Sequence, residues 1–538
     1  MEIIGIALGL LLAVAVVGAV GKWVPIPLPI LQVAAGVGLS YLPELRSLKV
    51  PPELFFLLFI PVLLFGDAWI IPKRDLLRVL RPVLQLAIGM VLLSTLAIGY
   101  LVHWLVPAMP LAAAFALGAV ISPTDAVAVT EVTRRLQVPA RVTTIVGGES
   151  LINDASGLVA FKFAVGVAMT GVLSWGKAAA DLVLLSGGGF LLGLAVAWLA
   201  GQLRRQLVRF SADDPTIQTI ISLLTPYAAY FAAERLGLGG ILAVVAAGLY
   251  SGVIDARNND AATRRHAWEV WTMVLYTFNG LVFILLGVQL HDVLDAVPEG
   301  RGLGLALLAI VVSLAVIALR LIWVFPLAYL PLLVSPRLRQ REGGMYAPRN
   351  VFIVGWAGIR GALTLAAALS IPVATSTGGG FPGRELFIIV AASVIVITLC
   401  VYGLTLPLFI RWLGVRADNA AEREERAARL AAAKAAASAI REELPRLTET
   451  AEAAYAQTLI EEYERRIEHH SAQPEQRRSV EARRDAERRL RLAALQAERA
   501  ELLQLRDTDV INDEVLRLIQ EELDHVESLL AGERRHRD

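Results

Sequence analysis

The sequence predicts an all-α polytopic membrane protein with about thirteen transmembrane helices, followed by a soluble helical tail. Three observations support this fold class. First, 56% of the 538 residues are apolar, and the mean hydropathy is +0.60. Second, the apolar residues form runs of roughly 17–25 residues, long enough to cross a hydrocarbon core of about 30 Å. Third, these runs end near residue 415, and the chain beyond is rich in charged residues.

The predicted transmembrane domain, residues 1–415, contains thirteen such runs. They lie near residues 3–21, 24–42, 53–71, 83–106, 108–130, 142–170, 178–203, 215–234, 237–254, 267–290, 302–333, 350–372 and 384–412. The first run has no basic leader and no A-x-A-like cleavage site before a soluble domain, so we expect a retained span, not a signal peptide. Cys400 is the single cysteine, which excludes an internal disulfide and a cysteine-based metal site.

The loops between the runs alternate between rich and poor in basic residues. The richer set carries 18 of them: Lys22, Lys73, Arg74, Arg78, Arg81, Arg134, Arg135, Arg141, Arg204, Arg205, Arg209, Arg257, Arg264, Arg265, Arg337, Arg339, Arg341 and Arg349. The poorer set carries six: Arg46, Lys49, Lys177, Arg235, Arg301 and Arg384. The positive-inside rule places the richer set in the cytoplasm. In the cell membrane, we therefore expect the amino terminus outside and the carboxyl-terminal tail in the cytoplasm.

The predicted tail, residues 416–538, is charged and favours helix. Stretches rich in Ala, Glu, Arg and Leu lie near 419–442, 449–470, 477–505 and 512–531, with Pro445 and Pro474 between them. In the third stretch, leucines at spacings of three and seven predict a packed or coiled-coil face: Leu492, Leu495, Leu502 and Leu505. The mixed charges favour a solvated surface, and a regulatory or dimerising role is the alternative.

Two carboxylates lie inside the sixth apolar run, in Gly148-Glu149-Ser150-Leu151-Ile152-Asn153-Asp154. On a helix, Ser150 and Asp154 share one stripe, and Glu149 and Asn153 share another about 100° away. Ionised side chains within a bilayer usually line a water-filled path or an ion site, because burying them in lipid is costly. The side chains of one stripe are therefore available to bind an ion, while those of the other stripe are held by contacts with the rest of the protein.

The fifth run contains Ser122-Pro123-Thr124-Asp125, where the proline removes a backbone donor and favours a break. We expect Ser122 to cap the helix that resumes at Pro123, with Asp125 near its start beside freed carbonyls. Carboxylate, hydroxyl and carbonyl oxygens suit a hard cation such as Na⁺, and they also suit a proton.

Two arginines also lie within the membrane. Glycines weaken the twelfth run around Arg360, in Gly355-Trp356-Ala357-Gly358-Ile359-Arg360-Gly361, and Arg320 lies in the eleventh run.

These segments together resemble the monovalent cation:proton antiporter 1 family, which includes the animal sodium/proton exchangers and bacterial relatives. Four features occur in the order of the family: Ser122-Pro123-Thr124-Asp125, Gly148 to Asp154, the isolated Arg320, and Gly358-Ile359-Arg360-Gly361-Ala362. The resemblance covers roughly residues 1–415. It implies thirteen helices in inverted repeats, with the fifth and twelfth unwound and crossing near the bilayer middle. It also implies a homodimer, with a dimerisation part and a moving core part.

The resemblance further implies roles for the site residues. Asp154 is the carboxylate that binds the cation and the proton, and Asp125, Ser150 and the Thr124 carbonyl complete the Na⁺ site. Asn153 is also expected among the ion- and proton-binding residues. It stands where electrogenic relatives carry a second aspartate, which suggests that one sodium exchanges for one proton.

The charged residues around this site have structural roles in the family. The resemblance therefore implies that Glu149 pairs with Arg320, and that Arg360 neutralises the partial negative charge of the broken twelfth helix. Asp67 is not assigned, because the third-span acid of the family is displaced by one position in this chain. Lys162 is expected to snorkel or to pair internally, and not to be a ligand.

The predicted function is secondary antiport of a monovalent cation, Na⁺ before Li⁺ or K⁺, against H⁺. Burial of Asp154 disfavours its charged form, so a proton and a cation compete for it, and exchange follows if only the loaded carrier crosses. A cation channel or an ion- or pH-responsive sensor is the alternative, although no selectivity-filter-like repeat is present. No cofactor or nucleic acid is expected. An enzyme is not expected either, since Ser150 has no motif-defined histidine partner and no nucleophile elbow.

Overall fold

The computed structural model describes most of the chain. The residues outside the described set are 1, 44–50, 137, 171–174, 211–213, 296, 298–299, 301, 343, 373–380, 416–419, 448–449, 472–473, 509 and 536–538. They include Arg46, Lys49 and Arg301, on which the predicted orientation partly depends, and Arg416, where the predicted tail begins. The chain divides into two compact units, Met1–Asp418 and Asn419–Asp538.

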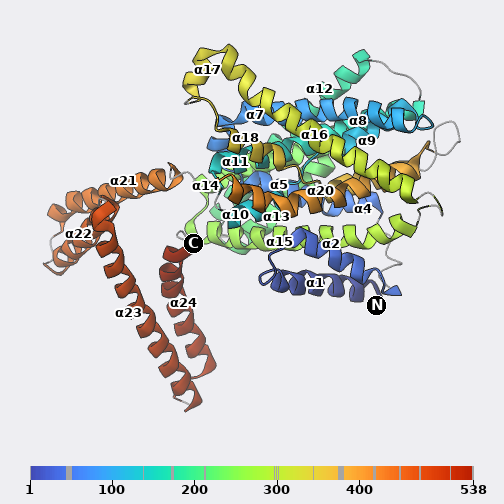
Figure 1. The fold of residues 1–538 in the computed structure, drawn as a ribbon. Helices are drawn as coiled ribbons and strands as arrows, with labels where there is room; N and C mark the ends of the chain where they lie inside the picture. Colours follow the sequence, from blue (N-terminus) through green and yellow to red (C-terminus); the bar gives the residue numbers. More distant parts are fainter. Residues whose placement is uncertain are drawn as a thin grey trace. The chain divides into compact units, whose positions relative to one another are not determined.

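The described part of the first unit is built from helices, and they overlap every predicted apolar run (Figure 1). They are α1 (Glu2–Val20), α2 (Leu28–Leu39), α4 (Pro52–Leu58), α5 (Ile60–Ile70), α6 (Lys73–Arg78), α7 (Leu80–Leu84), the π-helical turn η1 (Gln85–Met90), α8 (Val91–Leu105), α9 (Leu111–Val120), α10 (Ala126–Arg135), α11 (Ala140–Thr170), α12 (Trp175–Arg209), α13 (Pro215–Arg235), α14 (Gly240–Asn258), α15 (Ala261–Asp295), α16 (Gly302–Val334), α17 (Pro336–Arg341), α18 (Pro348–Trp356), α19 (Ala362–Leu369) and α20 (Arg384–Trp412).

Eight helical segments in the described ranges are long and apolar enough to cross a bilayer. They are Glu53–Ile70, Leu80–Leu105, Ala140–Thr170, Leu184–Arg209, Gly240–Asn258, Ala261–Val293, Gly302–Val334 and Arg384–Trp412. Shorter apolar helices are Ile4–Val20, Leu28–Leu39 and Leu111–Val120. The all-helical fold class is thus confirmed, and the chain is a multi-pass membrane protein.

Helix α13 is more polar than these segments because its polar side chains face protein. Gln218, Thr219 and Ser222 are buried, and the indole of Trp271 on α15 donates a hydrogen bond to the Ser222 hydroxyl over 3.1 Å.

Two of the predicted runs contain non-helical segments. Within 108–130, α9 ends at Val120 and α10 begins at Ala126. Within 350–372, α18 ends at Trp356 and α19 begins at Ala362. The first interruption contains Pro123, which has no backbone donor, and the second contains glycines, which favour helix least after proline.

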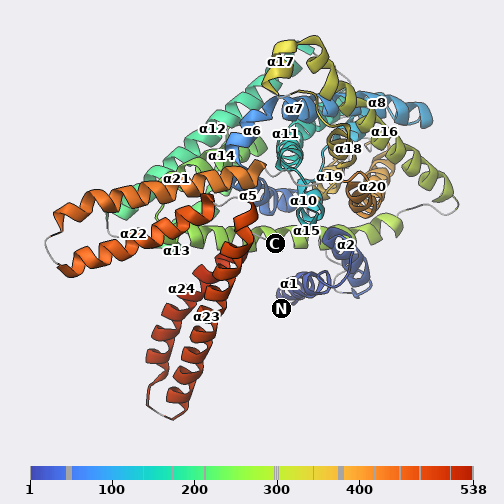
Figure 2. The ribbon, with the colours of Figure 1, turned by 60° about the vertical axis from the view of Figure 1, so that its left-hand side comes forward.

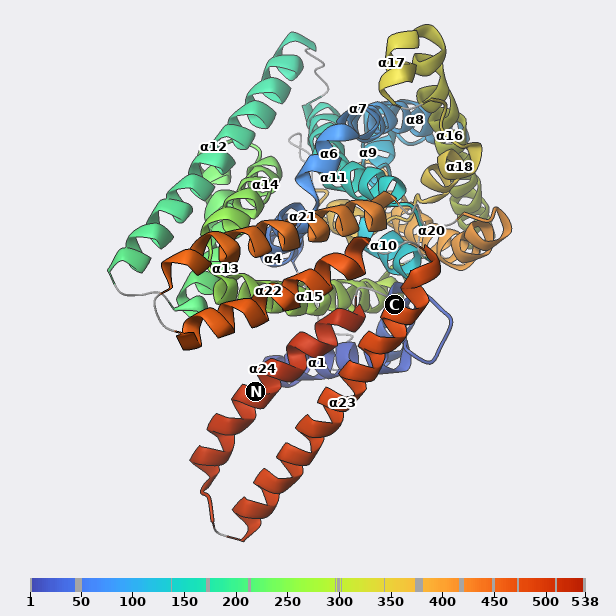
Figure 3. The ribbon, with the colours of Figure 1, turned by 90° about the vertical axis from the view of Figure 1, so that its left-hand side faces the viewer.

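Helix contacts divide the first unit into two groups, which lie side by side in Figure 3. One group comprises α1, α2, α5, α12, α13, α14 and α15, and the other comprises α8 to α11, α16, α18, α19 and α20. Helices α2 and α15 are so close that a Cβ on Gly36 would lie 2.1 Å from the Ile284 carbonyl oxygen. The groups meet where α11 contacts α5 and α14, and where α15 contacts α19 and α20.

The second unit consists of two helical hairpins (Figure 2). Helices α21 (Ala420–Glu443) and α22 (Thr450–Ser471) form one, and α23 (Pro474–Asp507) and α24 (Asp513–Arg535) form the other. On the predicted leucine face of α23, Leu495 is buried and Leu492, Leu502 and Leu505 are half-buried, whereas Leu490 is 73% exposed.

Candidate ion-binding site

The interruption between α9 and α10 places a carboxylate at a helix start. Asp125 is the N-cap of α10, and its Oδ1 accepts a hydrogen bond from the Val127 amide over 2.8 Å. The prediction that Ser122 caps a helix resuming at Pro123 is wrong. The chain remains non-helical through Thr124, and Asp125, whose carboxylate is an equally favoured cap, begins the helix instead. The Ser122 hydroxyl is buried and has no hydrogen-bond partner in the described part of the chain.

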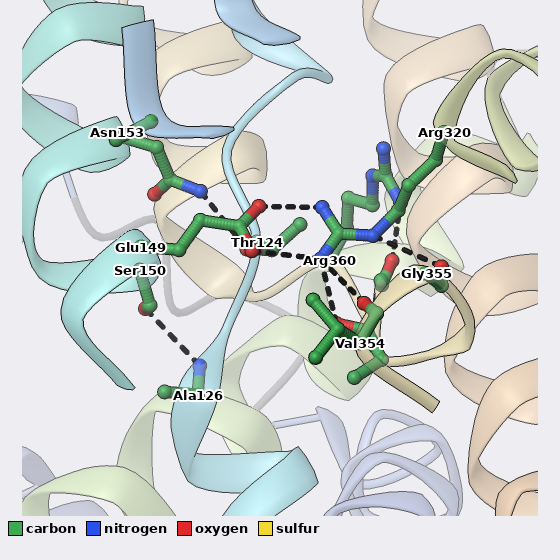
Figure 4. Close-up of polar contacts among 12 residues, drawn as sticks. Thr124, Ala126, Glu149, Ser150, Asn153, Arg320, Val354, Gly355 and Arg360 are labelled. Carbon is green, nitrogen blue, oxygen red and sulfur yellow. Dashed lines mark hydrogen bonds and ion pairs between the residues drawn. The ribbon is translucent and has the colours of Figure 1, made fainter. Parts of the chain in front are cut away.

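Helix α11 holds this interruption through two side chains (Figure 4). The Ser150 hydroxyl accepts a hydrogen bond from the Ala126 amide over 3.1 Å. The Asn153 amide nitrogen donates to the Thr124 hydroxyl over 2.9 Å. Asn153 belongs to the stripe that we expected the protein to hold, and the Asn153 Oδ1 remains buried without a partner among the described residues.

Asp154 lies one helical turn beyond Ser150 and has different surroundings. Over the described ranges, its carboxylate forms no hydrogen bond or ion pair. It lies close enough to Asp125 and to Asp67 of α5 to be repelled by both. These three side chains are half-buried, and no group of three carboxylate, imidazole or thiolate side chains is arranged to hold a metal ion in the described part.

Glu149, five residues before Asp154, has a complete set of partners. Its two oxygens accept from Arg320 Nη1 over 2.5 Å and Nη2 over 2.8 Å, and both side chains are at most 1% exposed. Arg320 also donates to the carbonyls of Gly355 and Val354 at the end of α18, each over 3.1 Å (Figure 4). A bidentate pair of this kind fixes α11 against α16 and α18.

Arg360 joins the two interruptions to each other. It is fully buried, and its Nε donates to the Ile121 carbonyl over 3.0 Å, while Nη1 donates to the Gly358 carbonyl. The Asp125 amide in turn donates to the Ile359 carbonyl over 2.7 Å. The arginine thus satisfies backbone acceptors that the missing helical turns leave free.

Three features of this region were not predicted from the sequence. The first is the direct hydrogen bond between the two interruptions. The second is Gly361, where a Cβ would lie 2.4 Å from Asp125 Oδ2, so only glycine permits this approach. The third is the nearness of Asp67 to the other acids, and its signal was an acid inside the third apolar run. Lys162 pairs with Glu234 of α13 over 3.9 Å, in keeping with the expected internal pairing.

Carboxylates at interrupted helices, inside a multi-pass helical protein, are characteristic of membrane proteins that transport ions. The chain belongs to the sodium/hydrogen exchanger family of monovalent cation:proton antiporters, because residues 10–412 match the family model for the transmembrane part of sodium/hydrogen exchangers. This confirms the resemblance found in the sequence.

Relatives of known sequence and structure agree. An uncharacterized Na⁺/H⁺ exchanger of Escherichia coli (strain K12) is 38% identical over 99% of this chain and 100% of its own length. The sodium, potassium, lithium and rubidium/H⁺ antiporter of Bacillus subtilis (strain 168) is 35% identical over 99% of this chain and 79% of its own. The solved structure of the sodium proton antiporter MjNhaP1 from Methanocaldococcus jannaschii has a TM-score of 0.59, with 18% identity, over 76% of this chain and 98% of that one. The last likeness supports the fold.

Proposed function

We propose that this protein is a secondary antiporter that exchanges a monovalent cation for H⁺ across the cell membrane. One observation carries the proposal: Asp154 has no partner in the described chain, although Glu149 on the same helix has a complete set. Repulsion from Asp125 and Asp67 makes an unneutralised Asp154 costly. Binding of either a cation or a proton removes that cost, so the two compete for one carboxylate.

The proposed Na⁺ ligands are Asp125, Asp154, the Ser150 hydroxyl and the Thr124 carbonyl. Ser150 and Asp125 are held by hydrogen bonds to the start of α10, so their oxygens need little rearrangement to coordinate a cation. Asn153 acts on the site by holding the Thr124 hydroxyl. Glu149 and Arg320 stabilise the fold around the site, and Arg360 satisfies the carbonyls of the interrupted helices.

The proposed architecture has thirteen spans in two inverted repeats. In this count, one interrupted span consists of α9 and α10, and another consists of α18 and α19. These two spans cross where the Asp125 amide is hydrogen-bonded to the Ile359 carbonyl. The two helix groups correspond to a dimerisation part and a moving core part, whose relative movement would expose the site to each side in turn.

The proposed exchange is electroneutral, with one cation for one proton. In this proposal Asp154 has no second titratable carrier next to it, since the preceding residue is the neutral Asn153. The E. coli relative is named for Na⁺ alone, whereas the B. subtilis relative is named for four alkali cations. We propose Na⁺ as the cation of this chain, with Li⁺ and K⁺ as the competitors to test.

Residues 1–415 form the proposed transport domain and residues 416–538 a cytoplasmic tail with a regulatory or dimerising role. The excess of basic residues in one set of loops supports this orientation. No catalytic reaction is proposed, and a homodimer is the proposed assembly.

The test is dissipation of a preset pH gradient in proteoliposomes after addition of Na⁺, Li⁺ or K⁺, with the membrane potential clamped. We expect cation-dependent proton movement that is lost in Asp154→Asn. Exchange that persists in this variant would remove the proposed carrier site. A cation current without counter-movement of protons would replace antiport by a channel, and no response to any cation would favour a sensor.

A further inference from the structure

A cavity of about 100 Å³ lies among helices of the first unit, and none of the proposed ion ligands lines it. It is bounded by α7 with η1, the first turns of α11, the last turns of α16, and α18. These helices contact one another, and they lie together close to α17 in Figures 1 and 2. The segments Leu80–Leu105, Ala140–Thr170 and Gly302–Val334 all reach the cavity at the end that adjoins an arginine-rich loop. The cavity therefore lies at the depth of one membrane interface.

The interior of the cavity is apolar. Leu86, Val324, Val351 and Val354 line it, and each is at most 6% exposed. An apolar cavity of about 150 Å³ remains dry and accepts a small hydrocarbon, so this somewhat smaller one suits part of a single alkyl chain. These walls offer nothing to a soluble polar ligand.

The rim of the cavity is basic. Arg141 Nη2 contacts Glu342 Oε2 over 2.5 Å and donates to the Tyr346 hydroxyl over 3.0 Å. Its guanidinium carbon also lies 4.8 Å from the centre of the Tyr346 ring. Arg81 is exposed and forms no ion pair within the described ranges. The rim thus carries two guanidinium groups and one carboxylate, which leaves Arg81 available to an anion.

We propose that this cavity binds one anionic phospholipid of the adjoining leaflet, with an acyl chain among the apolar side chains and the phosphate at Arg81. Basic pockets between transmembrane helices commonly hold acidic head groups. The chain end would contact Val354, whose carbonyl accepts from Arg320 over 3.1 Å. The bound lipid supports α18 at the point where Arg320 holds it.

The test uses phosphatidylglycerol with a diazirine near the end of one acyl chain, in phosphatidylcholine vesicles that contain the full-length protein. After photolysis, adducts are assigned to residues by mass spectrometry. We expect adducts on Leu86, Val324 and Val351, which bulk lipid cannot reach because they are at most 6% exposed. Adducts confined to outward-facing positions such as Leu330, 60% exposed, and Leu333, 65% exposed, would overturn the proposal.

Two matched pairs of variants separate the cavity from the surface. Arg81→Gln should lower the interior adducts about fivefold, the contribution of one basic residue to binding an acidic lipid. Arg78→Gln at the end of α6, which does not line the cavity, should not. Ala328→Phe, which fills the cavity, should abolish them, whereas Ala318→Leu on the exposed face of α16 should not. An equal loss of interior adducts in each variant and its control would overturn the assignment of the lipid to this cavity.

The requirement for an anionic head group is tested separately, in an experiment on the unaltered protein that does not depend on the folding of any variant. The same photolabel on phosphatidylcholine should give about fivefold fewer interior adducts. Equal labelling would overturn the requirement for an anionic lipid. Loss of labelling in excess glycerol 3-phosphate would assign the site to a soluble phosphate compound instead of a lipid.

Discussion

Two carboxylates five residues apart on α11 have opposite surroundings. Glu149 is fully paired by Arg320 over 2.5 and 2.8 Å, whereas Asp154 faces other carboxylates. A side chain with a complete set of partners has no capacity to bind and release an ion, but a side chain without one does. This contrast supports the roles that we propose, in which Glu149 stabilises the fold and Asp154 carries the ion or proton.

Asp154→Asn should abolish exchange and leave the protein folded. The amide has nearly the same shape, and loss of the charge removes repulsion from Asp125 and Asp67. Cation-driven proton movement in proteoliposomes should fall to the level of empty vesicles, while the thermal unfolding temperature in detergent should not decrease. A large decrease in that temperature would show that Asp154 is structural.

Arg320→Ala should mainly reduce stability. It leaves Glu149 buried and unpaired, and removal of one partner of a buried ion pair costs about 3–5 kcal/mol. Thermal unfolding of the purified protein measures the loss. The control is Arg320→Ala combined with Glu149→Gln, which should recover part of it because no buried charge is left unpaired. Wild-type stability of the single variant would contradict the importance of the pair.

Gly361→Ala should weaken cation binding. The added Cβ would lie 2.4 Å from Asp125 Oδ2 and 2.8 Å from Asp125 Cβ, so the carboxylate must move. Overpacking of this kind costs about 1–3 kcal/mol. A cost of about 1.4 kcal/mol on the cation-bound form corresponds to a roughly tenfold higher half-saturating cation concentration. Gly166→Ala on α11 is the control, because its Cβ would have nothing within 4 Å. Equal effects of the two substitutions would argue against the contact.

At the scale of elements, the two interruptions support each other. The Asp125 amide reaches the Ile359 carbonyl over 2.7 Å, and Arg360 reaches the Ile121 carbonyl over 3.0 Å. Each segment thus supplies hydrogen bonds that the other lacks, and a buried non-helical backbone is possible only with such partners.

Asp125 caps α10 and also belongs to the proposed site, and two substitutions separate these roles. Asparagine caps a helix as well as aspartate does, whereas loss of a cap to alanine typically costs about 1 kcal/mol. Asp125→Asn and Asp125→Ala should both impair exchange, and only the alanine variant should lose stability by about this amount. Unfolding in increasing denaturant compares them. Equal stability of the two variants would contradict a stabilising role of Asp125 as the cap of α10.

For the whole molecule, the proposed carrier cycle predicts how the exchange rate depends on the membrane potential. If Asp154 carries either one Na⁺ or one H⁺, both loaded forms have the same charge. The initial exchange rate should then be the same at zero and at an imposed membrane potential set with K⁺ and valinomycin. A rate that changes several-fold with the potential would contradict one-for-one exchange, since each charge moved per 100 mV is worth about 2.3 kcal/mol.

The sequence by itself determined the all-helical fold class and where the helices lie along the chain, and it predicted the site residues that we propose. Apolar runs, intramembrane charges, Pro123 and the glycines near Arg360 are local signals, because the bilayer requires each segment to be apolar and hydrogen-bonded within itself. The same local reasoning failed at Ser122, because Ser122 and Asp125 are both good caps and the pattern alone does not rank them.

The tertiary structure decided which segments meet. The bond from Arg360 to Ile121 joins residues 239 positions apart, and the pair of Arg320 and Glu149 joins residues 171 apart. The place of Asp67 beside Asp125, the close approach at Gly361 and the basic-rimmed cavity also depend on distant packing. Such contacts have no local signal, because hydrogen bonds and steric fit between separate helices depend on how the helices pack and not on the residues along any one of them.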